Sequence, residues 1–433
     1  MSRTIAARSR HLTGTDHVST PAVGGSAEGA SATPAGRPRR PHRKPRLLAV
    51  DAARGLALIG MFSIHIMNAY DARTFEPTLQ WTLFAGRAAA LFVLLAGLGL
   101  ALFSGGRIPQ RGRQLSAARA GLAVRALLIM AVGLLINELM PTPPHALDIL
   151  VHYGVLFLLA IPFLGMRRRT LAVCAVAFAV LGPVLRHVLA PGLPLPLATN
   201  LTFGDIVGQP GAALSQLLLT GSYPAVPYMA YLCAGLFIGR CHLRQRIVAA
   251  RMAVLGVGLA LGTWLVYWGA VLQSAGYDAL LEHTPWLSEE QIDEIIVWGP
   301  ETTLPTTTWW WQLIPGPHAN TVVSVLQDLG TSAAVLGAFL LLARAAGGRW
   351  LLPLSAMGSM TLTLYTAHLL GLSLVLHDDQ PTAWFTVHLV IAMFFAVAWH
   401  KAFGPGPLER LVSRAAGGAR RAALGPAARP GER

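Results

Sequence analysis

The chain has 433 residues, of which 54% are hydrophobic and only 12% are charged, and its formal net charge is +14. A soluble protein carries about 25% charged residues, so this composition excludes an ordinary soluble domain. Long apolar runs recur along the chain, which predicts an all-α, polytopic integral membrane protein embedded in a lipid bilayer. The basic residues lie in loops and tails, where membrane topology places them, so we expect no nucleic-acid partner.

Residues 1–46 are rich in Ser, Thr, Ala, Gly and Pro and end in "GRPRRPHRKPR". They lack apolar periodicity, which predicts a disordered basic tail. A transmembrane domain is expected over 47–403, and a second basic tail over 404–433. Within the domain we predict ten apolar helices, near 47–70, 83–104, 121–140, 147–165, 170–190, 222–239, 252–274, 320–343, 350–376 and 384–403.

The charges give these helices an orientation. Alternate connections and the two tails hold 30 of the 34 Lys and Arg residues, while the opposite connections hold only Arg73 and Arg186. Seven of the 20 acidic residues crowd into one of those opposite connections, 275–317. Because positively charged loops stay on the cytoplasmic side, both termini are expected in the cytoplasm and 275–317 outside.

The outside loop has two features. "WLSEEQIDEIIVWG" places apolar and acidic residues on different faces at helical spacing, which predicts a short amphipathic helix. The three tryptophans of "TTTWWWQL" indicate either an aromatic belt at the membrane interface or a lip that stacks on carbohydrate.

The first apolar segment carries three ionisable residues, Asp51, Arg54 and His65. Such groups are costly at membrane depth, so each is a functional-site hypothesis. Asp51 and Arg54 can pair on one helical face. Arg54 and His65 are about 16.5 Å apart along a helix, so we expect the cation near the inner face and the base near the outer one. A purely structural His65, bonded to a neighbouring helix, is the alternative.

Further polar residues are expected at the outer level. In "HALDILVHYG", Asp148 and His152 are spaced so that the carboxylate can orient the imidazole; a capping Asp and a buried His are the alternative. His318 opens the eighth helix, where backbone N–H groups favour an anion. The remaining candidates at this level, His368 and Arg87, lie in the ninth and second helices.

The inner loop "GGRIPQRGRQLSAARAGLAVR" is strongly basic. Its charges either set the membrane topology and bind lipid headgroups, or bind a phosphate-rich cofactor from the cytoplasm. Walker and GxGxxG motifs are absent from the sequence, and the three cysteines form no CxxC pair, so we expect no metal site. The arginines of this loop are Arg107, Arg111, Arg113, Arg119 and Arg125.

The segment "LLAVDAARGLALIGMFSIHIMN" resembles the opening helix of the transmembrane acyltransferase superfamily, in particular its heparan-α-glucosaminide N-acetyltransferase-like branch. The interval from Arg54 to His65 matches the spacing in related sugar O-acyltransferases. "GRAAALFVLLAGLGLAL", "ILVHYGVLFLL", "GSYPAVPYMAYLCAGLFIGR" and "AMGSMTLTLYTAH" are further similarities, and together they extend over about 46–414.

The resemblance implies that acetyl-CoA, or another acyl-CoA, binds from the cytoplasm and that its acyl group reaches a saccharide or glycolipid acceptor outside. Arg54 and the inner arginines would hold the CoA, and His65 would act as general base or carry the acyl group. In the heparan-type enzymes an Asn takes the place of His65, and the catalytic His lies in the next outside loop. Here "DARTFEPTLQW" has no His, and Glu76 is its nearest titratable candidate.

We therefore interpret the chain as a multi-pass acyltransferase of a bacterial plasma membrane, with catalytic His65, Asp148, His152 and His318. Two other classes remain open. A proton-coupled transporter could use the same buried His, Arg and Asp residues, and a non-catalytic scaffold could bind partners through its outer loop. A homodimer is also left open.

Overall fold

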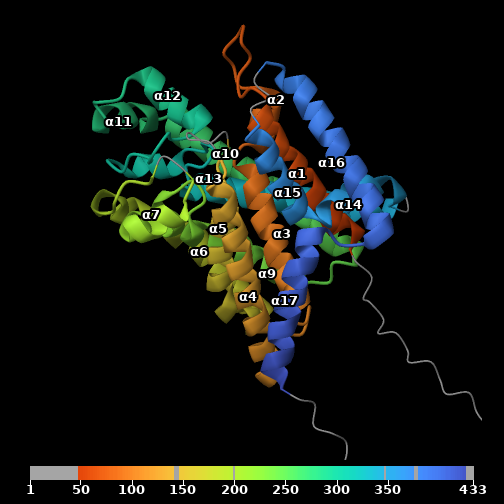
Figure 1. Cartoon of the computed structure of the whole chain (residues 1–433). Coiled ribbons are helices and arrows are strands. Elements are labelled where there is room, and N and C mark those ends of the chain that lie inside the picture. Colours follow the sequence, from red (N-terminus) through yellow and green to blue (C-terminus); the bar gives the residue numbers. More distant parts are fainter. Residues whose placement is uncertain (1–46, 141–145, 198–199, 346–347, 375–378, 426–433) are drawn as a thin grey trace, which may run out of the picture. The chain divides into compact units, whose positions relative to one another are not determined.

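The computed structural model describes residues 47–140, 146–197, 200–345, 348–374 and 379–425. Every named element in these ranges is helical (Figure 1), and the β pairing there is limited to one bridge between Tyr70 and Pro77. The two predicted tails lie outside the described residues over 1–46 and 426–433.

The named elements of the described residues, in chain order, are all helices. The α-helices are α1 Leu48–Ile66, α2 Leu79–Phe84, α3 Arg87–Phe103, α4 Gly112–Asn137, α5 Leu150–Ala160, α6 Arg168–Leu189, α7 Phe203–Gly208, α8 Pro210–Ser215, α9 Ala225–Gly239, α10 Arg246–Tyr267, α11 Gly276–His283, α12 Glu289–Trp298, α13 Val322–Ala345, α14 Leu352–Gly358, α15 Thr361–Leu372, α16 Pro381–Phe403 and α17 Pro407–Leu424. Short 3₁₀ or π segments are η1 Ile161–Gly165, η2 Ala190–Gly192, η3 Gln216–Thr220, η4 Trp268–Leu272, η5 Trp309–Leu313 and η6 Arg349–Leu351.

Among the described residues, seven helices are long and apolar enough to cross a membrane. They are Leu48–Ile66, Leu79–Phe103, Gly112–Asn137, Arg168–Gly192, Arg246–Leu272, Val322–Arg344 and Pro381–Phe403. The predicted all-α, multi-pass class is thereby confirmed. All ten predicted apolar segments contain a helix, but Leu150–Gly165 and Ala225–Gly239 are shorter, and the ninth segment is divided between α14 and α15.

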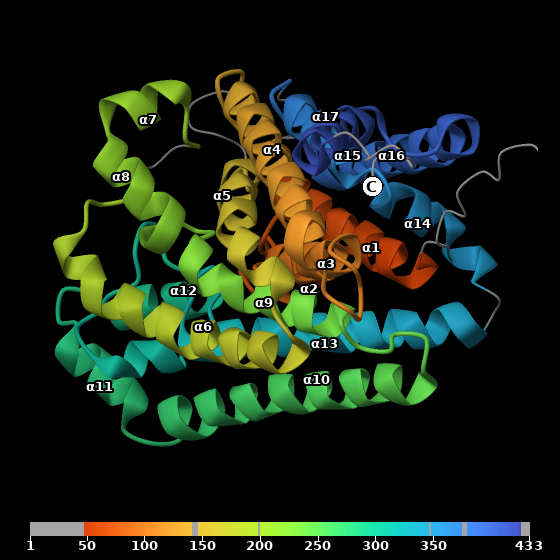
Figure 2. The same ribbon diagram turned by 90° about the horizontal axis from the view of Figure 1, so that it is seen from below.

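Extensive helix–helix contacts join segments that are distant in sequence. α10 packs along α13, at the edge of the bundle that Figure 2 shows, and α3 packs along α9. α1 contacts α14, α15 and α16. These last contacts bring the first apolar segment of the chain against the last two, which matters for the site described below.

Glycines allow two of these helix pairs to approach at backbone distance. A Cβ atom at Gly97 of α3 would overlap the carbonyl oxygen of Leu232 on α9, and one at Gly235 of α9 would overlap the carbonyl oxygen of Leu94. Close approach at small residues is a main source of helix association in membranes, where lipid is as apolar as the side chains. The same reciprocal contact joins α1 and α14 through Gly55 and Gly358.

One buried arginine fixes the connection that follows α3. Arg240, at the end of α9, is only 3% exposed. Its guanidinium donates hydrogen bonds to the carbonyl oxygens of Ala101, Gly106 and Leu164 and to Ser104 Oγ. Four acceptors offset the cost of burying the charge, so Arg240 fastens α3 and the end of η1 to α9.

The beginning of α1 and the end of α16 lie at the same end of the bundle. Gly358, the last residue of α14, lies against the backbone of Asp51, and Gly406, after α16, lies against Met360. We call this end the Arg54 end and the opposite one the His65 end.

The segment 404–433, predicted as a tail, contains a folded helix. α17 packs along α4 and buries Val412 and Ala416. Its Glu409 accepts hydrogen bonds from the backbone N–H groups of Leu362 and Thr363 at 2.7 and 3.2 Å, which caps the start of α15. The apolar face of α17 is narrow and lies between arginines. It is sufficient to hold the helix in place because α17 packs against both α4 and α15.

Residues 271–319 form a small hydrophobic core of their own, separate from the main one. The predicted amphipathic helix is present as α12, capped by Ser288 and Gln291, and it buries Ile292 in this core. The three tryptophans are not one belt. Trp311 is fully buried, whereas Trp309 is 55% exposed and its ring lies 4.4 Å from that of His187.

The glycine contacts predict a sharp difference between two Gly→Ala variants. Gly235→Ala forces α3 and α9 apart and should lower the free energy of unfolding by about 2 kcal/mol or more. Gly258→Ala on α10 meets no atom within 4 Å and should be neutral or slightly stabilising. Thermal unfolding of both proteins in detergent checks this, and equal midpoints would contradict the proposed backbone contact.

Candidate functional site

Three histidines from three helices form a hydrogen-bonded row at the His65 end. His65 Nδ1 on α1 lies 3.0 Å from His368 Nε2 on α15, and His368 Nδ1 lies 3.1 Å from His388 Nε2 on α16. His368 is fully buried, and the ring of Phe62 stacks on it at 4.3 Å. Each link joins a different pair of helices, so the row exists only in the folded bundle.

The helix contacts explain why these rings meet. Phe62 and His65 are one turn apart on α1, and Tyr365 and His368 are one turn apart on α15, so each pair lies on one helical face. The rings of His65 and His368 are nearly parallel at 5.3 Å, and the ring of Tyr365 lies 6.4 Å from that of His65. The packing of α1 against α15 therefore aligns these two faces.

His318 lies beside this row in an unusual backbone conformation. His318 and Asn320 have φ values of +55° and +53°, which are strained for residues with a side chain and are found preferentially at functional sites. The backbone oxygen of Ser222 lies 3.4 Å from His318 Nδ1 and accepts a hydrogen bond from Asn320 Nδ2. Burial lowers the pKa of the His318 imidazole, which keeps the ring neutral at pH 7.

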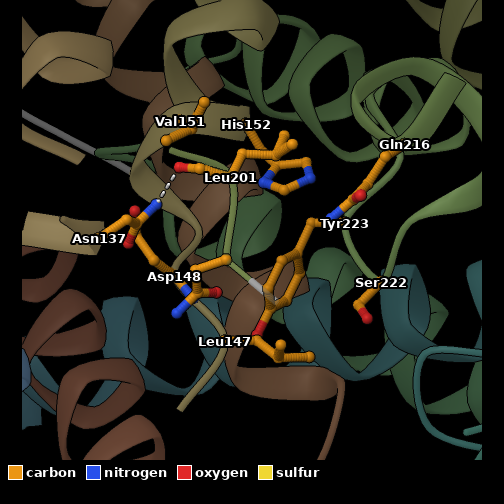
Figure 3. Close-up of a pocket in the computed structure, with 10 residues that line it drawn as sticks. Asn137, Leu147, Asp148, Val151, His152, Leu201, Gln216, Ser222 and Tyr223 are labelled. Atoms are coloured by element: carbon orange, nitrogen blue, oxygen red, sulfur yellow. Dashed lines mark hydrogen bonds between the residues drawn. The ribbon is translucent and has the colours of Figure 1, made fainter. Parts of the chain in front are cut away.

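A small cavity of about 20 Å³ opens next to His318, with room for about one water molecule. The ring of Tyr223 lies 5.7 Å from that of His152 and 5.1 Å from that of His318. Figure 3 shows the side chains of Asp148, His152 and Tyr223 around this space. The lining residues are Asn137, Leu147, Asp148, Val151, His152, Asn200, Leu201, Gln216, Ser222 and Tyr223.

Asp148 and His152 line the cavity together, but the predicted hydrogen bond between them does not form. Asp148 Oδ1 instead accepts a hydrogen bond of 2.9 Å from the backbone N–H of Leu150 and caps the start of α5. Within the described part of the chain, both ring nitrogens of His152 are buried without a hydrogen-bond partner. Of the two readings of this motif, the structure favours the capping Asp, because the helix begins between the two residues and its first N–H groups compete for the carboxylate.

Arg87 and Asp328 form a second polar group close to His318. Arg87 Nε lies 3.9 Å from Asp328 Oδ1, and Tyr231 donates a hydrogen bond of 3.5 Å to Asp328 Oδ2. A Cβ at Gly86 would lie 3.5 Å from His318 N and 3.6 Å from Asp328 Oδ2. The expectation that Arg87 lies at the same level as the histidines agrees with this geometry.

Sequence reasoning missed Asp328 and His388. Both are ionisable residues inside predicted apolar segments, so the rule that singled out Asp51, Arg54 and His65 would have found them. Glu76, by contrast, is an exposed residue of the loop between α1 and α2, and its backbone oxygen accepts a hydrogen bond from Asp71. The structure provides no contact between Glu76 and the histidine row.

Arg54 occupies the opposite end of α1. Its predicted pairing with Asp51 is confirmed, with Arg54 Nη1 2.8 Å from Asp51 Oδ1. Arg54 Nη2 donates a hydrogen bond of 3.1 Å to the carbonyl oxygen of Leu95. The side chain is still 24% exposed. Arg54 lies within electrostatic range of Tyr153 on α5, which in turn interacts with Tyr365.

The other predicted cofactor-binding arginines spread over the Arg54 end. Arg107 and Arg111 are exposed in the loop before α4, and Arg113 donates to the carbonyl oxygen of Leu424 on α17. Arg125 lies farther along α4, 5.9 Å from the ring centre of Phe157 and within electrostatic range of Arg54. The Arg54 end therefore carries several positive charges, and the hydrogen bond of Arg113 joins the start of α4 to the end of α17.

Comparison with known proteins identifies the family of the chain. A family model with the description "Heparan-alpha-glucosaminide N-acetyltransferase, catalytic" matches residues 46–270. No curated protein matches the chain. The matched region includes Arg54, His65 and His152 and covers more than half of the sequence. It favours a transferase over the transporter and the scaffold that composition alone left open.

The burial of Asp148 predicts a pH-dependent stability. Burial raises the pKa of this carboxyl from 3.8 to about 6, so the folded state favours the protonated form. That contribution is complete below about pH 4 and is lost as the pH rises through about 6. Asp148→Asn stays neutral, and its unfolding free energy should exceed that of the wild type by roughly 3 kcal/mol at pH 7 and by little at pH 4.

Thermal unfolding of the two proteins in detergent across this pH range measures the difference. Asp278→Asn is the matched control, because Asp278 is exposed on α11. A constant difference between Asp148→Asn and wild type at all pH values would contradict the raised pKa.

Proposed function

The chain belongs to the family of heparan-alpha-glucosaminide N-acetyltransferase catalytic domains, and on that premise we propose that it carries an acetyl group across a membrane. The donor is acetyl-CoA, or another acyl-CoA, bound at the Arg54 end. The acceptor is an amino or hydroxyl group of a saccharide or glycolipid at the His65 end. The family description names a glucosaminide, which supports an acceptor of this class.

The residues of the Arg54 end fit a CoA molecule. The Arg54 side chain remains partly exposed while it bonds Asp51 and Leu95, and the exposed Arg107 and Arg111 lie at the same end. Guanidinium groups bind phosphate oxygens through paired, charge-assisted hydrogen bonds. The thioester of acetyl-CoA supplies the activated acyl group. The role of Arg54 is to hold an anionic or polar part of the donor at the mouth of the bundle.

The polar interior supports a route between the two ends. The Tyr153 hydroxyl is buried without a hydrogen-bond partner in the described ranges, and the Tyr365 hydroxyl donates to the carbonyl oxygen of Leu147 at 3.4 Å. Buried hydroxyl groups are costly unless they have partners. A pantetheine-like arm with amide groups would supply such partners along this line.

His65 is proposed as the general base. Its Nδ1 is engaged by His368, which orients the ring and leaves Nε2 for the acceptor. Nε2 removes the proton from the acceptor N–H or O–H as that atom bonds to the acyl carbon, and the bond from the acyl carbon to sulfur breaks. A neutral His318 and the cavity around His152 lie at the same level and would orient the acceptor.

The charge distribution supports the orientation and location. The Arg54 end carries the connections that are rich in Lys and Arg, so we place it in the cytoplasm. The core of 271–319 then lies outside and covers the acceptor side. A multi-pass protein of the bacterial plasma membrane is the setting that the sequence resemblance supports.

The proposal depends most on one observation: a single helix places a half-buried arginine at one end and an oriented histidine at the other. Its first test is acetyl-CoA binding by calorimetry to the purified protein in detergent. Arg54→Ala should weaken binding about tenfold or more, since a charged hydrogen bond contributes about 1.5–3 kcal/mol. Arg73→Ala, at the opposite end, should bind as the wild type does. Absence of binding to folded wild type would refute the donor assignment.

The second test is acetyl transfer to glucosamine as acceptor probe. His65→Gln should lower the transfer rate by about 100-fold or more and leave acetyl-CoA affinity within about twofold. The exposed His283 on α11 provides the control variant His283→Gln, which should transfer at the wild-type rate. A His65→Gln protein with undiminished turnover would show that another group is the base.

A further inference from the structure

We propose that His65, His368 and His388 form a proton relay that connects the reacting acceptor to the edge of the bundle. The proposal rests on the function proposed above and deepens it, because it assigns a role in proton transfer to two residues outside the family match, which ends at residue 270. Both His368 and His388 would act through His65 and are therefore positioning and relay residues.

The geometry of the row is suited to proton transfer. The two links are 3.0 and 3.1 Å long and use alternate nitrogens, Nδ1 to Nε2 and again Nδ1 to Nε2. These are ordinary hydrogen-bond distances between a ring N–H and a ring nitrogen acceptor. Because each ring uses its Nδ1 toward the next, the row has one direction, from His65 to His388.

The middle histidine of the row is fully buried and the two end histidines are half-buried, as a proton relay requires. His368 is 0% exposed, with Phe62 stacked on its face and also in edge contact with His388 at 4.9 Å. His388 is half-buried on α16, a helix with few buried residues. The apolar ring of Phe62 shields the middle of the row, so protons enter or leave at its two ends.

Few other titratable groups lie near the three histidines, so we assign the proton transfer to the histidines themselves. Tyr365 on α15 faces His65 and His368, and His318, before α13, lies within electrostatic range of His65. His388 on α16 contacts the rings of His368 and Phe62. The row can therefore spread a positive charge over three rings, instead of confining it to His65.

The proton balance closes over one turnover. His65 Nε2 takes the acceptor proton, His65 Nδ1–H moves to His368 Nε2, His368 Nδ1–H moves to His388 Nε2, and His388 Nδ1–H passes to solvent. When the carbon–sulfur bond breaks, the same transfers run in reverse from a solvent proton at His388 Nδ1. His65 Nε2 then delivers a proton to the leaving thiolate, and every ring regains its starting tautomer.

The relay predicts a kinetic effect at a residue that touches no substrate. His388→Gln should lower kcat about tenfold, within the range of a positioned acid–base group, with unchanged acetyl-CoA affinity and an altered solvent deuterium isotope effect. His388→Ala should be partly rescued by imidazole added to the buffer. The matched control is His400→Gln on the same helix, since His400 bonds Ser359 Oγ at 3.1 Å near the opposite end; it should keep the wild-type kcat.

A second readout needs no turnover. ¹⁵N NMR of histidine-labelled protein should show that His388→Gln changes the ring shifts of His368 and His65, whereas His400→Gln leaves them unchanged. Unaltered shifts would overturn the row. Wild-type kcat and isotope effect in His388→Gln would overturn the relay while the acetyl transfer stands. A wild-type protein that shows the NMR coupling but transfers no acetyl group would refute the proposed function, and with it the catalytic role of the row.

Discussion

Backbone contact between helices is the constraint on which the rest of this structure depends. Gly97 and Gly235 bring α3 and α9 together so closely that a methyl group has no space, and Gly55 and Gly358 do the same for α1 and α14. In a bilayer, burial of apolar side chains provides little drive for association, so such packing must hold the helices. It also fixes their rotation, and rotation decides which side chains face the interior.

The fixed rotation of α1 explains how polar groups are tolerated inside the bundle. Asp51 pairs with Arg54 at one end, and His65 bonds His368 at the other. Each group has a partner from its own helix or a neighbour, which offsets part of the desolvation cost. His152 differs from these residues, since both of its ring nitrogens lack a hydrogen-bond partner in the described structure. Such an orphaned group beside a cavity is typical of a site that completes its hydrogen bonds with a ligand.

Much of the fold could be predicted from the sequence, because hydrophobic length and loop charge are local properties. Every predicted apolar segment contains a helix, and the amphipathic pattern before Trp298 is α12. The division of the ninth segment and the shortness of α5 were not predictable from hydropathy, which does not register the break at Ser359. The helix α17 was also missed, because its narrow apolar face gains stability from its packing against α4 and from its contacts with α15.

For the site, the sequence by itself determined which residues are chemically costly in a membrane, including Arg54 and His65, and their separation along one helix. It could not determine which of them meet. Tertiary structure alone decided that His65 bonds His368, that His368 bonds His388, and that Asp148 caps a helix instead of orienting His152. The physical reason is that these contacts depend on the rotation and crossing of helices far apart in sequence, and close backbone packing sets both only in the folded bundle.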